Sequence, residues 1–329
     1  MSILVSVLIP SAGRRAHFLA RAIESALIDE KEIKTEILVI LNGKDGMAFN
    51  LANAFQHPLV TYYKIKEANV SKARNFGLSK AQGDLIRFLD DDDFLYPKVA
   101  YQQYLEIFNT HADLSTYGGA VEDQFVRYQT ILPIYYRDYC AAVLSANCPA
   151  LTFATVYKAT LIKDLMWQET ISIAEDESWM RLIAEKREVS WITSKNVVGV
   201  WYQHNIDRLS YAYAHPDFGK NRYLSIDRCL KMLTSNNRMT TERKNAAVEG
   251  IWSSIHSSFF FSPWYWTLKS FIARDLNKMI LPAHLKKYNI PYWLNPILIE
   301  WILLPKRLMN HIFRVIRFKL KIGSFIRKG

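Results

Sequence analysis

The first half of the chain alternates between short apolar runs and longer segments in which apolar residues recur at helical spacing. Four runs have the length and composition of buried strands: 5–9, 37–41, 60–64 and 85–89. Helices are predicted between and after them: from Arg15, over 47–56, over 69–78 and over 97–108. This alternation predicts an α/β domain with a mainly parallel sheet flanked by helices.

The pattern becomes less regular after the first hundred residues. Further strands are predicted at 114–120, 125–132, 153–157 and 197–204, of which the first two suit a hairpin. A helix is predicted to follow Ser178, and beyond residue 215 the chain becomes helical, aromatic and basic. We therefore expect two parts, which are a domain over 1–215 and a helical C-terminal extension over 216–329.

Two segments of the extension are candidates for contact with a membrane. Residues 250–268 contain no Lys, Arg, Asp or Glu, but serines, His256 and Pro263 dilute their apolarity, so we do not predict a membrane span. The tail alternates apolar with basic residues: Leu308, Ile312, Val315, Ile316, Leu320 and Ile322 with Lys306, Arg307, Arg314, Arg317, Lys319 and Lys321. That pattern is typical of a helix on anionic lipid headgroups, and equally of a packed helix with a solvated basic face.

Composition narrows the possible partners. The chain has 329 residues and a net charge of +11, which fits an anionic partner such as nucleic acid, an acidic membrane or a phosphorylated substrate. Cys140, Cys148 and Cys229 show no CxxC spacing, so the cysteines indicate neither a zinc site nor a disulfide framework. The first ten residues lack the basic and apolar regions of a secretory signal, which predicts a cytoplasmic protein.

The strongest chemical signal is a run of four carboxylates directly after the apolar run at 85–89. Asp90, Asp91, Asp92 and Asp93 follow where the chain leaves the predicted sheet. Adjacent carboxylates repel one another, and a divalent cation bound with a phosphate would neutralise them, because hard cations take oxygen ligands. Ligands of open α/β sheets bind beyond the carboxyl ends of the strands. The plain alternative is a solvated acidic turn.

Polar residues follow the other predicted strands as well. Some of them lie at the end of the first predicted strand, and others in the polar, turn-prone loop over 42–46. A third group lies near the start of the helix at 69–78, where cations and free backbone amides suit a diphosphate. These candidates are Pro10, Ser11, Arg15, Asn42, Ser71, Lys72 and Arg74. Singly they are ordinary turn and surface residues, but the topology would bring them to one edge of the sheet.

The ordered set of motifs resembles the nucleotide-sugar half of glycosyltransferase family two, the inverting GT-A enzymes. The likeness rests on 5–10 with Arg15, Asn42-Gly43, Ala73-Arg74-Asn75 and 88–93. It implies a Rossmann-like GT-A fold and a nucleotide-diphosphate sugar as donor, with a UDP-sugar expected. The family usually carries an acid pair after the second strand, and this chain departs from it with Leu41-Asn42, so the nucleobase is less determined.

The resemblance also assigns the motif at 175–179. Asp176 would be the base that accepts the proton of the attacking hydroxyl group, with Glu175 and Trp179 on the acceptor side. The plain alternative is that acids in a first helical turn stabilise the helix dipole, by about 0.3–1 kcal/mol each.

A metal site is implied at the aspartate run. Asp92 would be the principal ligand, with His204 and Asp90 beside it, and the expected cofactor is Mn²⁺ or Mg²⁺. A lone histidine is also common as a purely structural residue. The donor-binding set is Pro10, Ser11, Arg15, Asn42, Ser71, Lys72, Arg74, Asp90 and Asp91.

Two other functions fit parts of the sequence. A metal-dependent nucleotidyltransferase or phosphatase would need an aspartate directly after the first strand or a glycine-rich phosphate loop, and residues 10–13 supply neither. A basic non-catalytic protein would bind nucleic acid or a membrane, but the first domain shows no nucleic-acid motif or basic cluster, so no nucleic-acid partner is predicted.

Three features together suggest an acceptor and a cellular location. They are the family resemblance, the basic tail and the lack of a secretory signal. We expect a glycan or lipid-linked acceptor in bacterial surface polysaccharide synthesis, such as O-antigen, capsule or lipooligosaccharide. The protein would lie peripherally on the cytoplasmic face of the inner membrane and contact its anionic surface through the C-terminal region. Nothing in the sequence indicates an oligomeric state.

Overall fold

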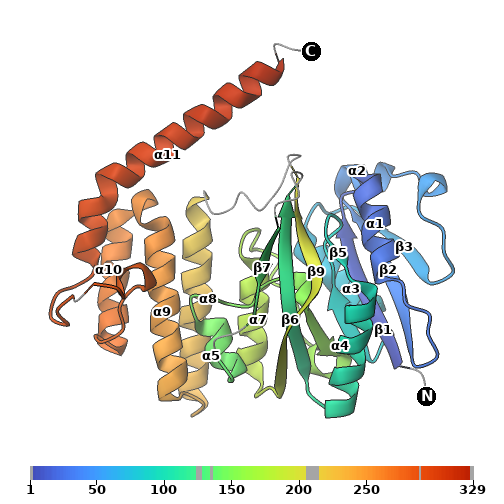
Figure 1. Cartoon of the computed structure of the whole chain (residues 1–329), viewed down its shortest axis with the longest axis horizontal. Helices are drawn as coiled ribbons and strands as arrows, with labels where there is room; N and C mark the ends of the chain where they lie inside the picture. Colours follow the sequence, from blue (N-terminus) through green and yellow to red (C-terminus); the bar gives the residue numbers. More distant parts are fainter. Residues whose placement is uncertain (1–2, 124–127, 134–135, 205–214, 289, 327–329) are drawn as a thin grey trace.

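The computed structural model describes residues 3–123, 128–133, 136–204, 215–288 and 290–326 (Figure 1). Within these residues one sheet has the strand order β3-β2-β1-β4-β8-β6-β9-β5, with β7 paired to β6. The strands are β1 (Ile3–Ser11), β2 (Ile33–Asn42), β3 (Val60–Ile65), β4 (Leu85–Phe88), β5 (Phe94–Leu95), β6 (Leu114–Asp123), β7 (Tyr128–Ile131), β8 (Thr155–Lys158) and β9 (Trp191–Gln203). The predicted α/β fold is confirmed.

The sheet is mixed, however, and not mainly parallel as predicted. β3, β2, β1 and β4 are parallel neighbours, and β6 also runs parallel to β9. The pairs β4–β8, β5–β9, β6–β7 and β6–β8 are antiparallel, and β6–β7 is the predicted hairpin. The parallel half follows from crossover helices, whereas the later strands are joined by connections that reverse the chain direction.

Helices cover both faces of the sheet. Val7 and Ile9 of β1 join the core beneath α1 (Ala16–Ala26) and α4 (Pro97–Thr110), while Leu8 joins the opposite core. That opposite core contains α3 (Val70–Lys80), α5 (Tyr139–Leu144), α6 (Ala159–Ile162) and α7 (Glu175–Lys186). Alternate residues of a strand point to opposite faces, so a strand such as β1, which is buried along almost its whole length, contributes to both cores.

The C-terminal extension packs directly on α5 and α7. It consists of α8 (Pro216–Ser235), α9 (Thr241–Ser258), α10 (Pro263–Leu276) and α11 (Ile297–Ile326), with short 3-10 turns η4 (Phe259–Phe261) and η5 (Ala283–Leu285). Its buried Ile226, Ile251 and Trp252 belong to the same hydrophobic cluster as Phe88 of the sheet. The hydrophobic core is thus continuous across residue 215, and the division at that residue stays a prediction based on composition.

The last helix leaves the body of the molecule. Figure 1 shows α11 starting beside α9 and α10 and then extending away from them to the C-terminus. The predicted tail helix is therefore present, although most side chains beyond Asn310 lie outside the described residues. Of the helices that the structure describes, none has an apolar stretch long enough to cross a membrane.

One predicted loop and one predicted helix were wrong. The loop over 42–46 is instead largely helical, since α2 spans Gly43–Ala48, and the helix predicted over 47–56 is reduced to the 3-10 turn η1 (Leu51–Asn53). Gly43 has a φ of +74°, which lets the chain turn from β2 straight into a helix. The Asn50 side chain then accepts a hydrogen bond from the Ala52 amide (3.0 Å) and starts a separate turn.

Candidate active site

Chemically active side chains gather where β1, β4 and β9 end and where α1 and α7 begin. Ser11 is the last residue of β1, and Arg15 is the N-cap of α1. The aspartate run follows β4, His204 follows β9, and Asp176 lies in the first turn of α7. Sites beyond the carboxyl ends of parallel strands are expected for a sheet of this type.

Arg15 forms the centre of a first cluster. Its guanidinium donates to Asp91 (Nη2 to Oδ1, 2.9 Å) and to Asp92 (Nη1 to Oδ2, 3.0 Å), and it also contacts His204 Nε2. Asp92 Oδ2 lies 2.9 Å from His204 Nε2. Ser11 Oγ donates to the other oxygen of Asp91 (2.5 Å). One arginine is thus shared by two adjacent carboxylates of the run.

Asp91 and Asp92 have different surroundings. Asp91 is buried, and burial raises its pKa to about 6 although Arg15 and the Ser11 hydroxyl oppose the shift. Asp92 is less enclosed and shares its Oδ2 oxygen between Arg15 and His204. Asp91 therefore anchors the aspartate loop, while Asp92 faces Arg15 and His204, the side chains that a ligand would contact.

Arg74 of α3 forms the second cluster and joins the aspartate run to α7. Its guanidinium donates to Asp90 (2.8 Å) and to Glu175 (3.2 Å) and lies over the Trp167 ring, 4.3 Å from the centroid. Arg74 itself is only 2 % exposed. A buried planar guanidinium with two carboxylate partners fixes the distance between the two acidic motifs.

Asp176 is partly exposed beside this cluster. Ala174 enters the helix in the left-handed conformation (φ 61°, ψ 30°), which turns the chain sharply before Asp176. Asp176 Oδ1 accepts a hydrogen bond from the Glu177 amide (2.7 Å). Burial raises the pKa of Asp176 to about 8, and the carboxylates of Glu175 and Glu177 act in the same direction while Arg74 opposes them. A carboxylate that binds a proton near neutral pH has the property that a general base needs.

Trp179 does not belong to this site, contrary to the prediction that it faces the acceptor. It is 2 % exposed and stacks on Trp167 with ring centroids 4.7 Å apart and an interplanar angle of 4°. The Phe88 ring forms a T-shaped contact with Trp179, with centroids 5.9 Å apart. The large apolar surface of the ring favours burial in the core, so Trp179 packs α7 against that core and does not contact a ligand.

Two residues predicted to bind the donor from α3 also lie elsewhere. Ser71 is fully buried, and the Lys72 ammonium pairs with Glu67 at 3.9 Å. The Asn69 side chain caps this helix by accepting from the Lys72 amide (2.9 Å). Of the three predicted residues on the helix, Arg74 is the one that bonds to the carboxylates, because its long side chain carries the guanidinium to both Asp90 and Glu175.

The predicted ligand set Asp90, Asp92 and His204 is not assembled as one group. Asp90 pairs with Arg74, whereas Asp92 and His204 meet at Arg15. Among the described residues, the clusters of three ligand atoms within 4.8 Å of one another do not include these three. Asp92 and His204 are close enough to share a cation, whereas Asp90 lies with Arg74, so its place in the ligand set stays a prediction.

Pro10 and Asn42 lie at the same edge of the sheet as the clusters. Ser11 and Leu41 are paired in the register of β1 and β2, so Pro10 and Asn42 end neighbouring strands. Asn42 is partly exposed, while Pro10 is buried in the strand. Asn42 is therefore available to a ligand through its side chain, and Pro10 contributes only to the shape of the edge.

Arg21 of α1 is a site residue that sequence reasoning missed. Its guanidinium donates to the backbone oxygen of Asp92 (2.9 Å) and packs between the rings of Phe94 and Tyr202, 4.3 and 4.4 Å from their centroids. The Tyr202 amide in turn donates to Asp93 Oδ1 (3.1 Å). The aspartate loop is thus tied to α1 and β9. The signal in the sequence was weak, because a helical arginine is usually a surface residue.

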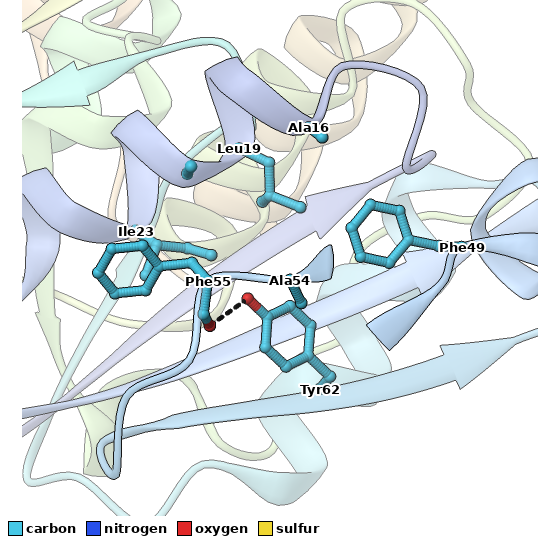
Figure 2. Close-up of a pocket in the computed structure, with 8 residues that line it drawn as sticks. Ala16, Leu19, Ile23, Phe49, Ala54, Phe55 and Tyr62 are labelled. Carbon is cyan, nitrogen blue, oxygen red and sulfur yellow. Dashed lines mark hydrogen bonds between the residues drawn. The ribbon is translucent and has the colours of Figure 1, made fainter. Parts of the chain in front are cut away.

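An apolar pocket of about 170 Å³ lies beside α1 (Figure 2). The side chains come from α1, from the segment around η1, and from Tyr62 of β3. Tyr62 donates its hydroxyl hydrogen to the backbone oxygen of Phe55 (2.9 Å), which Figure 2 marks as a dashed line. No charged side chain lines the pocket, so it lacks the groups that would recognise a diphosphate.

Comparisons with known proteins place this geometry in context. Residues 6–164 match the model of glycosyl transferase family 2. Two uncharacterized glycosyltransferases, from Rickettsia felis and Rickettsia conorii, are 26 % identical over 190 residues, which are 57 % of this chain and 31 % of each relative. The chain thus spans about a third of the length of the curated relatives that it matches.

A solved structure with the same fold supports the assignment at the level of architecture. The crystal structure of residues 1–349 of S. aureus TarS, in complex with UDP-GlcNAc, is 14 % identical with a TM-score of 0.55. The likeness covers 84 % of this chain and 88 % of the TarS chain. It therefore extends beyond the matched family segment into the C-terminal helices, and the fold is of the GT-A type.

Proposed function

Because residues 6–164 match the model of glycosyl transferase family 2, we propose that the protein is an inverting enzyme that transfers a sugar from a nucleotide-diphosphate sugar to an acceptor hydroxyl group. The observation that carries the proposal is the joining of two acidic motifs through Arg74, which bonds to both Asp90 and Glu175. This contact brings a carboxylate with a raised pKa, Asp176, beside the aspartate run.

The residues divide into a leaving-group side and an acceptor side. Asp176 accepts the proton of the acceptor hydroxyl as its oxygen bonds to the anomeric carbon and the bond to the diphosphate breaks from the opposite face. Arg15 is placed to exchange its carboxylate partners for diphosphate oxygens and to stabilise the charge that develops there. Glu175 holds Arg74 and so positions Asp176.

A divalent cation, Mn²⁺ or Mg²⁺, fits beside Arg15. Asp92 and His204 supply an oxygen and a nitrogen only 2.9 Å apart, and both already face a positive group in this structure. A cation held there would neutralise the leaving diphosphate as a Lewis acid. Hard cations complete their coordination with phosphate oxygens and water, so two protein ligands are sufficient.

The proposed donor is a UDP-sugar, and Asn42 is placed to contact its nucleoside. Asn42 lies at the end of β2, where it offers an amide with both donor and acceptor atoms. The family match favours glycosyl transfer over the nucleotidyltransferase, phosphatase and non-catalytic alternatives.

A panel of nucleotide sugars tests the proposal. The purified full chain is incubated with each donor and with Mn²⁺, Mg²⁺ or a chelator, and released nucleoside diphosphate is measured. We expect release from one donor and its loss with chelator, because Asp92 and His204 act through the cation. Absence of release from every donor, with lipid-linked acceptors present, would contradict the proposal.

Asp92→Ala is the discriminating variant for this experiment. We expect calorimetry to show weakened metal-dependent binding of the donor, since the variant removes the oxygen shared between Arg15 and His204. Asp84→Ala serves as a control. Asp84 precedes β4, at the opposite end of that strand from the aspartate run, and its carboxylate accepts a hydrogen bond from the Leu4 amide. Unchanged metal affinity in Asp92→Ala would remove Asp92 from the site.

The C-terminal helices present an exposed apolar surface that we assign to a membrane. Trp264 and Leu268 lie one turn apart on α10 and are 76 % and 66 % exposed, and Ile302 of α11 is 75 % exposed. The rings of Trp264 and Trp301 contact each other at 5.1 Å, so the two helices present adjoining surfaces. Large exposed apolar patches indicate an interaction site.

Basic residues around this apolar surface favour an anionic membrane. Lys278, Lys286, Lys287 and Lys306 are exposed on the same part of the chain. Aromatic residues suit the interfacial region, and each lysine near an anionic surface contributes about 1 kcal/mol. We therefore propose peripheral binding to the cytoplasmic face of the inner membrane and a lipid-linked or glycan acceptor of surface polysaccharide synthesis.

Vesicle co-sedimentation tests the membrane assignment. The double variant Trp264→Ser/Ile302→Ser is expected to bind anionic vesicles more than about tenfold more weakly than the wild type, because each lost apolar side chain removes roughly 1.5–3 kcal/mol of burial. Phe108→Ser, which removes an aromatic side chain of 49 % exposure from α4, is the matched control. Equal binding by the double variant and the control would exclude this surface.

A further inference from the structure

Two histidines and a glutamate converge at the base of α11, far along the chain from the candidate active site. His256 Nδ1 of α9 lies 2.7 Å from Glu300 Oε1, and His284 Nε2 of η5 lies 3.3 Å from the same oxygen. The three potential ligand atoms all lie within 4.8 Å of one another. Each residue comes from a different element, so the cluster joins three parts of the C-terminal extension.

The orientation of the histidines is unusual for a simple hydrogen-bonded group. The two imidazole rings stack with centroids 3.9 Å apart and an interplanar angle of 28°, and both point a nitrogen at one carboxylate oxygen. His284 Nε2 is buried and makes no hydrogen bond of acceptable geometry. A cation held between this nitrogen and Glu300 Oε1, which are 3.3 Å apart, would satisfy both atoms.

Glu300 is prepared as an anionic ligand. It is 1 % exposed, and its carboxylate is surrounded by His256, His284 and Arg307. Arg307 donates to Glu300 Oε2, the oxygen that does not face the histidines, and also to the backbone oxygen of His256. Outer partners of this kind orient a metal-binding carboxylate.

A second cluster of ligand type differs in a decisive respect. Asp138, Cys140 and Glu188 also lie close together, but Arg243 forms two hydrogen bonds to each of the two carboxylates. Its carboxylate oxygens are therefore already occupied by a cation. In the histidine cluster Arg307 occupies only the outer oxygen of Glu300, so Oε1 remains directed at the two imidazoles.

We propose that His256 Nδ1, His284 Nε2 and Glu300 Oε1 bind a zinc ion that fastens the base of α11 to α9 and η5. Two imidazole nitrogens and one carboxylate oxygen are a ligand set that zinc takes in a tetrahedral site, with water in the fourth position. His256 and His284 are partly exposed, which leaves room for that water and a path for the ion.

The site would stabilise the start of the helix that carries the proposed membrane surface. Trp301 follows Glu300, donates through Nε1 to Thr267 Oγ1 of α10 (3.0 Å), and packs against Phe259 of η4. Zinc bound by Glu300 would add a cross-link between these packed turns and the rest of the extension. Zinc binding does not depend on glycosyl transfer and is measured separately from it.

Equilibrium dialysis of the full chain against Zn²⁺, followed by metal analysis, tests the proposal. The measurement is made on protein without an affinity tag and in an Asp92→Ala/His204→Ala background, which removes the candidate cation site of the active site. We expect about one equivalent of zinc, since the cluster forms one site. Failure of this protein to take up zinc would overturn the proposal.

His256→Ala and His284→Ala locate the ion. Each is expected to weaken zinc binding by more than about 100-fold, because loss of even an outer-shell partner costs about 10- to 100-fold. His57→Ala, which removes an exposed histidine near η1, should leave the affinity unchanged. Unchanged affinity in both cluster variants would assign the zinc to another place.

A measurement on unmutated protein covers the case in which a variant does not fold. Histidine modification by diethyl pyrocarbonate is mapped by mass spectrometry with and without Zn²⁺. Zinc should protect His256 and His284, whose lone pairs it would occupy, but not His57. Equal modification of all three histidines in both conditions would contradict the site.

Discussion

Asp176→Asn is expected to lower the rate of sugar transfer by about 10²- to 10⁴-fold while leaving donor binding nearly unchanged, because an amide cannot accept the proton of the acceptor hydroxyl. The substitution preserves shape, and the hydrogen bond from the Glu177 amide to the Asp176 side chain can persist through the amide oxygen. Initial rates with saturating donor and acceptor, and donor affinity by calorimetry, measure the two parts of this result.

The pH profile supplies a second readout for Asp176. Burial and the neighbouring carboxylates raise its pKa to about 8, so its proton must be lost before it can act as a base. The wild-type rate should therefore rise with pH up to that region, and the residual rate of Asp176→Asn should lack the rise. Asp164→Asn, at an exposed carboxylate paired with Arg187, is the control. Comparable turnover in Asp176→Asn would remove the residue from its role.

Of the substitutions predicted for this protein, Arg74→Met should lower the free energy of unfolding the most. Removal of one partner from a buried ion pair costs about 3–5 kcal/mol, and here two carboxylates, Asp90 and Glu175, would lose their shared partner. We expect a value at the lower end of that range, because Asp90 is 36 % exposed and retains some hydration. The free energy of unfolding from denaturant titration gives the magnitude.

A matched arginine separates this effect from the loss of a positive charge as such. Arg14 pairs with Asp45 at the surface, with side chains 61 % and 48 % exposed, so Arg14→Met should change the stability by less than about 1 kcal/mol. Arg74→Lys should recover only part of the loss, since an ammonium group lacks the planar fork that reaches both carboxylates. Equal midpoints for Arg14→Met and Arg74→Met would show that Arg74 does not hold the two motifs together.

The parallel half of the fold could be predicted because its signals are local. Strands such as β1 and β4 are mostly apolar, interrupted only by Ser6 and Arg87 before their polar ends, and this composition predicts their burial. The sheet beyond β4 was harder to predict. Whether β8 pairs parallel or antiparallel depends on the path of the chain around α4 and β6, which no single stretch of sequence contains.

The candidate site shows the same division. The positions of the aspartate run and of the acidic turn at α7 could be read directly, and His204 was placed near Asp92 by resemblance. The sequence did not, however, predict which of the neighbouring side chains point inward. Ser71, Arg74 and Trp179 are all buried, yet only the guanidinium of Arg74 joins the carboxylates, and that depends on the rotation of the helices about their axes.

Arg15 also affects how a charged donor would bind at the candidate active site. In the structure the single positive charge of Arg15 is shared by the carboxylates of Asp91 and Asp92. Entry of a diphosphate then exchanges one set of ion partners for another and adds little net attraction over distance. Such an exchange should depend only weakly on ionic strength, because the charges involved lie within a few ångströms of one another and are screened little by salt. Selectivity for the donor would accordingly come from fit at short range rather than from long-range steering.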